Sequence, residues 1–408
     1  MTFVPARPFV FAAYLVSLAI YRLYCSPIAQ FPGPKLAALS RWYEFYHEVA
    51  LRGQFTFHIA ELHRKYGPIV RINPQELHAS DSEFWDTLYG PGRVDKYDDC
   101  SNRLNIPRSI FSTADYNLHV LRKAPLLPLF SKKRIADFQP VIREKLDILC
   151  TKIDGYVASG RPWAINRALT AFSGDVITTY VFSESYQHLE SPDFNETFHE
   201  PFMATSEVGH VALQFKWLYP LMNALPAWLV LKMQPQIFLV LQLGKDSIPT
   251  DFDAKLKAIL SGTAKENPDH PTILYELVRG DLPPQEKQID RLNEEAQLLV
   301  AAGLTPSSWA MSVAALHIVR SRHIYEQLRA GRGPVAAEQG HGPVVLPVRQ
   351  GQQVMSGREP RDSRDPAVPG DFVPQTNASD VALAHDFFLP SARLDSKGVR
   401  VTVKEAEK

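Results

Sequence analysis

Cysteine and net charge are both scarce in this sequence of 408 residues. Its three cysteines, Cys25, Cys100 and Cys150, are too few and too widely spaced for a disulfide framework or a CxxC zinc site. Lysine plus arginine and aspartate plus glutamate each number 44, so the formal net charge is zero. Because no overall basic field is present, nucleic acid is not an expected partner.

Several catalytic signatures are also missing. No GxSxG motif, P-loop or Rossmann fingerprint stands between a predicted strand and a predicted helix. His58 and His63 lack the HExxH pattern, so we expect no zinc site there. The hydrophobic fraction is 45%, which is typical of a globular chain with a large core and excludes a disordered or collagenous protein.

An apolar segment lies near the N-terminus. Residues 9–21 are apolar apart from one serine, and Arg7 and Arg22 flank them. A helix from Phe9 to Cys25 would be about 25 Å long, close to the ~30 Å of a bilayer's hydrocarbon layer. An uncleaved membrane anchor, a cleaved secretory signal and a buried core helix all fit, but no A-x-A-like cleavage site follows, which favours the anchor. The bias of positive charge after the segment predicts that the rest of the chain lies in the cytosol.

The remainder predicts a mainly α fold with a small β element. A helix over Phe55–Tyr66 should end at Gly67-Pro68, and a hairpin should pair Ile69–Ile72 with Glu76–Ala79 across Asn73-Pro74. Further helical periodicity covers residues 117–130, 137–156, 166–183, 252–260, 286–302 and 307–329.

The longest helical candidate is Ile289–Arg320. Asp290 is available as its N-cap, and the run Leu298–Ala302 is apolar enough for the centre of a large protein. Pro306 removes one helical hydrogen bond. It therefore marks either a locally opened helix that lines a ligand site or the junction of two helices.

The order of these pieces resembles a microsomal-type cytochrome P450 of fungal secondary metabolism, of the trichodiene-oxygenase-like kind. The resemblance rests on five fragments in the expected order, which are FPGPKLAALS, HRKYGPIVRINPQELH, FSTADYNLHVLRKAPLLPLFSKKRI, ALTAFSGDVITTYVF and LLVAAGLTPSSWAMSVAALHIV. It implies a cytochrome P450-like fold, incomplete at the C-terminus, with an anchor over residues 1–30, a helical body over 31–330 and an altered segment over 331–408. It also implies haem as cofactor, NADPH-cytochrome P450 reductase as partner, and an anchor in endoplasmic reticulum membrane lipid.

The resemblance also implies the residues that hold the haem. His119 and Lys123, with Arg122 beside them, have the spacing of the family's haem-propionate donors and fall on one face of a helix. A solvated basic face is the other interpretation. Ala302 and Gly303 match the small residues that leave room for the haem and oxygen.

The proton-delivery motif of the family is altered. The family has an acid followed by two threonines, whereas Thr305 stands here at the acid position and Pro306 and Ser307 at the threonine positions. We therefore assign the catalytic roles to Thr305 and Ser307, with water, as a weaker relay than an acid and an alcohol.

The axial haem ligand is missing from the expected place. A P450 needs a cysteine thiolate near the C-terminus, but Cys150 is the last cysteine of these 408 residues. The family's Glu-x-x-Arg pair is replaced by Gln350 and Gln353 in the better register. Residues 331–408 are also rich in glycine, proline, arginine and aspartate and poor in aromatics, which predicts partial disorder and indicates an altered reading frame or a decayed gene.

Two functions follow from the sequence. The first is a haem monooxygenase that oxidises an apolar small molecule such as a terpenoid, inactive in this chain because the axial cysteine is absent. The alternative is a non-catalytic, membrane-tethered helical protein that binds an apolar ligand.

Overall fold

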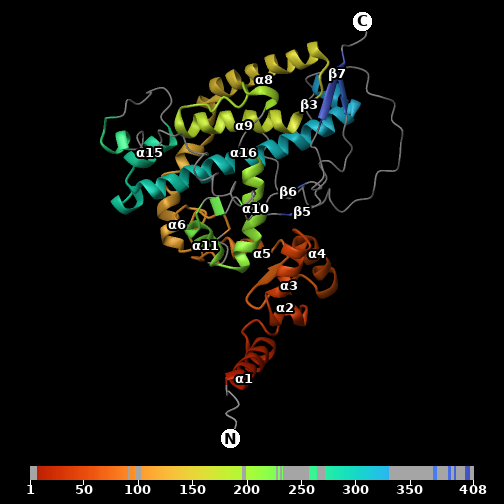
Figure 1. Ribbon diagram of the computed structural model, residues 1–408, viewed down its shortest axis with the longest axis vertical. Coiled ribbons are helices and arrows are strands. Elements are labelled where there is room, and N and C mark those ends of the chain that lie inside the picture. The colour runs from red at the N-terminus through yellow and green to blue at the C-terminus, as the bar shows by residue number, and fades with distance from the viewer. Residues whose placement is uncertain are drawn as a thin grey trace.

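The computed structural model describes residues 7–329, except 91, 98–102, 195–198, 227, 230–231, 233–256 and 264–271, together with four short strands after residue 370. Helices dominate, and the longest, α16 (Ile289–Arg320), crosses the middle of the molecule (Figure 1). The predicted mainly α fold with a small β element is confirmed. The predicted changes at Gln350 and Gln353 lie outside the described residues.

The N-terminal apolar segment is helical. It forms α1 (Arg7–Ile20), which continues into the π-helical turn η1 (Tyr21–Cys25). No part of the window Pro8–Cys25 is buried, and its length and composition make it a candidate membrane anchor. Helix α16 meets the same criteria of length and composition although it packs inside the protein, so these criteria alone are weak support for a membrane span.

Two arginines hold the junction between this segment and the body. Arg22 Nη1 donates to the carbonyl oxygen of Leu39 at 2.6 Å, and Arg71 Nη1 donates to the carbonyl oxygen of Arg22 at 2.7 Å. The backbone N–H of Arg71 also donates to the carbonyl of Pro32 at 2.8 Å. The proline-rich stretch Phe31–Pro34 is therefore fixed against the body.

The next elements form a small unit with its own apolar cluster. It contains α2 (Lys35–Leu39), α3 (Trp42–Phe45), the π-helical η2 (Tyr46–Ala50), α4 (Phe55–Tyr66) and the antiparallel strands β1 (Ile69–Arg71) and β2 (Leu77–Ala79). The predicted helix Phe55–Tyr66 and the predicted hairpin are confirmed. Helix α4 ends where Gly67 adopts a φ of 102°, a conformation that favours glycine.

The body continues with a series of helices. In order these are α5 (Phe84–Leu88), α6 (Tyr116–Lys123), η4 (Leu127–Phe130), α7 (Lys132–Asp137), α8 (Gln139–Ser159), α9 (Ile165–Phe182), η5 (Pro192–Phe194), α10 (His199–Gln214), α11 (Leu218–Ala224), α15 (Ile273–Arg279), η6 (Pro284–Lys287), α16 and α17 (Arg322–Arg329). Side-chain caps fix several of their starts. The carboxylate of Asp115 accepts from the N–H of Leu118 at 2.7 Å at the start of α6, and Ser131 and Thr272 cap α7 and α15.

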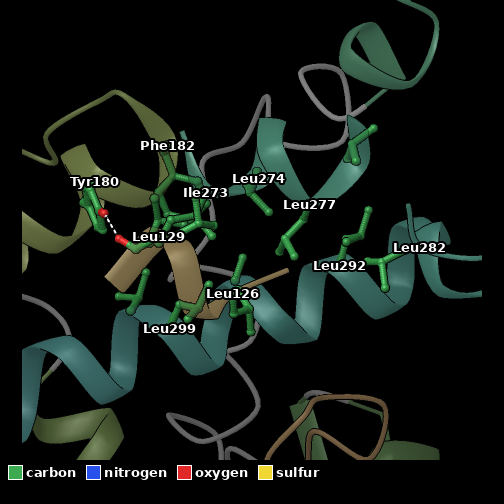
Figure 2. Packing of buried hydrophobic residues seen from close by; sticks show 14 of the residues in the cluster. Leu126, Leu129, Tyr180, Phe182, Ile273, Leu274, Leu277, Leu282, Leu292 and Leu299 are labelled. Atoms are coloured by element: carbon green, nitrogen blue, oxygen red, sulfur yellow. Dashed lines mark hydrogen bonds between the residues drawn. The ribbon is translucent and has the colours of Figure 1, made fainter. Parts of the chain in front are cut away.

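The main core lies where α9 and α15 pack against the first half of α16. Figure 2 shows Tyr180 and Phe182 of α9 at one end of this cluster, near Leu129 of η4, and Leu277 of α15 near Leu292 of α16 at the other. The hydroxyl of Tyr180 donates to the carbonyl of Leu129, which ties α9 to η4. Burial of this cluster fixes α16 along α9.

Two details of the sequence-based description of α16 are corrected. The helix runs without interruption through Pro306, so the proline does not separate two helices, and the break falls instead at Ser321 before α17. Gln288, not Asp290, occupies the N-cap position. Asp290 lies in the first turn, where its carboxylate pairs with Arg108 at 2.7 Å and suits the positive end of the helix dipole.

Short strands near the C-terminus extend the β structure. Strand β7 (Arg400–Lys404) pairs antiparallel with both β3 (Trp163–Ala164) and β4 (Asp371–Pro374). Strands β5 (His385–Asp386) and β6 (Pro390–Ser391) pair with each other. One sheet thus joins residues 163–164 of the body to two strands after residue 370.

Candidate functional site

Helix α16 has one exposed face that begins near its middle and continues toward its C-terminus. Successive residues of a helix are 100° apart, so Ala302, Pro306 and Ala310 fall on one side. All three are exposed, as are Ala314 and His317 further along. The opposite side is buried and carries Leu304, Thr305, Ser308, Ser312 and Leu316. The exposed side therefore presents small side chains over about three turns.

Gly303 faces Ile177 of α9. A Cβ at this position would be 2.6 Å from Cγ1 of Ile177 on α9. A side chain at Gly303 would therefore require Ile177 to shift, and the exposed side begins at Ala302.

The two predicted catalytic hydroxyls are not brought together. Thr305 is buried and its Oγ1 has no hydrogen-bond partner among the described residues, whereas Ser307 is exposed. Two residues along a helix correspond to a rotation of about 200°, so the side chains leave opposite sides of α16. A direct hydrogen bond between them is excluded by this arrangement.

A cationic cluster lies beside the N-terminal half of α16. We define it as Lys96, His119 and Lys123. The ammonium of Lys96 donates to the carbonyls of Ile110 and Phe111 at 3.1 and 3.2 Å, and Nδ1 of His119 is 3.3 Å from the same Ile110 oxygen. His119 and Lys123 are four residues apart and share one face of α6.

Burial and mutual repulsion both disfavour the charged forms of Lys96 and His119. Burial lowers the pKa of Lys96, and the charge of Lys123 lowers it further. Burial also lowers the pKa of His119, and the charges of Lys96 and Lys123 act in the same direction. An anionic group bound here would relieve this repulsion.

Ile110 connects the cationic cluster to α16. Its carbonyl faces Lys96 and His119, while its N–H donates to Oε2 of Glu295 at 3.2 Å. Glu295 precedes Ala302 by seven residues, which is two turns or about 10 Å along the same side of the helix. The cationic cluster and the exposed small residues of α16 therefore lie along one side of that helix.

The third predicted haem-binding residue, Arg122, pairs elsewhere. Its Nε lies 2.6 Å from Oε2 of Glu286 and its Nη2 lies 3.1 Å from Oε1, while its Nη1 donates to Thr113. Arg291 continues the network, with Nε 3.1 Å from Glu286 and Nη2 2.9 Å from Glu295. This buried ion network of two arginines and two glutamates joins α6, η6 and α16.

The ion network is balanced in charge but deeply buried. The side chains of Arg291 and Glu295 are 2% and 0% exposed. Burial raises the pKa of Glu295 and lowers that of Arg291, while each charge opposes the shift of the other. The network therefore depends on all four partners.

Sequence reasoning missed Lys96 and Glu286. Lys96 lies in a loop more than 20 residues before His119, and Glu286 lies 164 residues after Arg122. Neither has a local motif, because only the fold brings them to α6. The nearest signal was the turn DLPPQEK before α16, which places an acidic residue beside a helix N-terminus.

Comparison with known proteins agrees with the family resemblance found in the sequence. The sequence model of the family described as Cytochrome P450 matches residues 37–331. A cytochrome P450 monooxygenase of Sordaria araneosa is 41% identical over 78% of this chain and 63% of its own length. A tryptophan 6-hydroxylase of Fusarium equiseti is 38% identical over 72% of this chain and 58% of its own. An N-acetyltryptophan 6-hydroxylase of Emericella nidulans is 35% identical over 78% of this chain and 62% of its own. The chain thus spans about three fifths of the length of these relatives.

Proposed function

Because the chain belongs to the cytochrome P450 family, we propose that it is the body of a fungal haem monooxygenase of secondary metabolism that oxidises a small organic molecule with electrons from an NADPH-dependent reductase. The observation that carries the proposal is the position of the cationic cluster along the same side of α16 as Ala302. The fungal relatives support the reaction class.

The residues present fit one part of a haem. Lys96, His119 and Lys123 would bind its two carboxylates, which would relieve the repulsion described above. Ala302 would leave space for the flat face of the ring. Haem, when bound with a thiolate ligand, supplies oxygen activation. Arg122 would act indirectly, because its ion pairs with Glu286 fix the orientation of α6.

The residues do not fit the iron ligand. Cys25 and Cys150 are exposed, on η1 and α8, and Cys100 lies outside the described residues. Helix α8 faces the side of α16 that carries Ala315 and Val319, opposite Ala302 and Pro306, so Cys150 is separated from the exposed face of α16. No cysteine follows it. We infer that these 408 residues do not catalyse the monooxygenase reaction by themselves, and we derive no reaction step through the iron.

Two substrate classes are compatible with the family. An apolar molecule such as a terpenoid follows from the sequence resemblance. The names of two relatives, a tryptophan 6-hydroxylase and an N-acetyltryptophan 6-hydroxylase, favour an aromatic amino acid derivative as the second candidate. Competition between N-acetyltryptophan and a sesquiterpene for the protein separates the two.

The exposed helix formed by α1 and η1 supports an anchor in the endoplasmic reticulum membrane, with the body in the cytosol. The alternative function is a non-catalytic, membrane-tethered protein that binds an apolar ligand. It requires no axial cysteine, and saturable ligand binding by protein free of haem would favour it.

The experiment that tests the proposed haem site is titration of the detergent-solubilised chain with haem. We expect Lys96→Gln and Lys123→Gln to weaken haem binding at least tenfold. Lys133→Gln, on the exposed surface of α7, is the matched control and should have no effect. Haem dimethyl ester has no carboxylates, so it should bind all four proteins equally. Equal haem affinity for wild type and both cluster variants would refute the assignment.

A further inference from the structure

A cavity of about 260 Å³ lies between α8, α9, α16 and α17. It is distinct from the exposed face of α16. Its lining is entirely aliphatic or aromatic and comprises Leu149, Ile153, Trp163, Ile165, Ala168, Leu169, Ala315, Ile318, Val319 and Tyr325. No charged side chain contributes to it.

The cavity is remote from the proposed haem site. Ala315 follows Ala302 by 13 residues, which corresponds to about 20 Å along α16. Ala315, Ile318 and Val319 face α9 and α17, whereas Ala302, Pro306 and Ala310 are exposed on the other side. One helix therefore separates the two places, and a ligand in the cavity would not contact the cationic cluster.

The walls of the cavity are preformed by packed elements. Leu149, Trp163 and Ala168 belong to a buried cluster that also contains Phe194 and Leu316. The ring of Trp163 lies 6.0 Å from that of Tyr156 and 5.9 Å from that of Phe194. Helix α9 packs against both α8 and α16. Such walls keep their shape without a ligand, so binding requires little ordering.

Volume and lining define the class of ligand. An apolar cavity of about 150 Å³ in another protein stays dry and binds benzene. The larger volume here accommodates a substituted benzene or a bicyclic hydrocarbon. A charged ligand is excluded because no lining side chain would compensate its loss of hydration. We infer that this cavity is a second binding site, for an uncharged aromatic or terpene-sized hydrocarbon.

The test uses 4-bromotoluene as the probe, because its bromine quenches the fluorescence of an indole that it contacts. Trp163 is the buried tryptophan at the cavity, whereas Trp42, Trp85, Trp217 and Trp228 are exposed. We expect saturable, one-site quenching in the full detergent-solubilised chain and a rise in melting temperature with probe concentration. Trp163→Phe should remove the saturable component of the quenching but not the rise.

Adjacent residues of α16 supply the variant and its matched control. Ala315→Phe fills the cavity and should weaken probe binding at least tenfold, whereas Ala314→Phe adds the same ring on the exposed side and should not. Val319→Phe is a second filling variant if Ala315→Phe does not fold. Quenching that never saturates, or equal affinity for the Ala314 and filling variants, would overturn the inference. Neither outcome bears on the haem titration, which concerns other residues.

Discussion

The buried ion network gives the most direct prediction about stability. Glu286 contacts Arg122 at 2.6 Å and Arg291 at 3.1 Å, and the side chains of Glu286 and Arg122 are each 11% exposed. Glu286→Gln removes one negative charge and leaves two buried arginines with Glu295 alone. Breaking a buried pair by removal of one partner costs about 3–5 kcal/mol. We expect a loss of unfolding free energy in that range.

The assay is equilibrium urea unfolding of the detergent-solubilised chain, followed by circular dichroism. Glu326→Gln is the control, because its ion pair with Arg322 has the short distance of 2.6 Å but both side chains are more than half exposed. Exposed pairs of this kind contribute about 0–1 kcal/mol. The two variants therefore remove the same charge from environments that differ mainly in burial.

A double variant tests the charge-balance argument. Arg122→Met with Glu286→Gln leaves one arginine and one glutamate, Arg291 and Glu295, which contact each other at 2.9 Å. The double variant should be more stable than the sum of the single losses predicts, by at least about 1 kcal/mol. The reasoning is refuted if Glu286→Gln costs no more than Glu326→Gln, or if the two single losses simply add.

Three further predictions concern single positions. Gly303→Val should lower the unfolding free energy in urea by about 1–3 kcal/mol, because the new Cβ meets Ile177. Adding Ile177→Ala should restore part of this loss. An unchanged unfolding free energy for Gly303→Val would contradict the close helix contact. Asp175→Ala should cost about 3 kcal/mol, because the Asp175 carboxylate accepts two buried N–H groups at 2.9 and 3.0 Å; an effect below about 1 kcal/mol would show that these donors find other partners. Because the pKa of His119 is lowered in the folded state, its contribution to stability is present above its ordinary pKa of about 6.5 and is lost as the pH falls below that value. Wild type should therefore lose more unfolding free energy than His119→Gln between pH 7 and 5. The same dependence of unfolding free energy on pH in both proteins would contradict this.

Local signals were sufficient for several elements of the fold. Helix α4 was predicted with both ends correct, since apolar spacing defines it and Gly67 ends it. The hairpin β1–β2 followed from two short strand-like runs around Asn73-Pro74. The path of α16 through Pro306 was not determined by sequence, because a proline can end a helix or be accommodated when neighbouring helices pack around it.

Part of the candidate site could likewise be predicted from local sequence, and part could not. His119 and Lys123 share a helix face, which their spacing predicts. Arg122 occupies the same short helix, but its partner Glu286 is distant in sequence, so its ion pair was not foreseeable. Thr305 and Ser307 were assigned from their positions in the family's proton-delivery motif, whereas the helix rotation places one in the core and the other at the surface.

The central claim is that these 408 residues retain the body of a cytochrome P450 without a thiolate to ligate the haem iron. The most direct test is the carbon-monoxide difference spectrum of reduced membranes that express this chain with haem supplied. We predict a flat spectrum or one typical of a nitrogen-ligated haem. A strongly red-shifted Soret band of the thiolate type would show that a cysteine reaches the iron and would contradict the account.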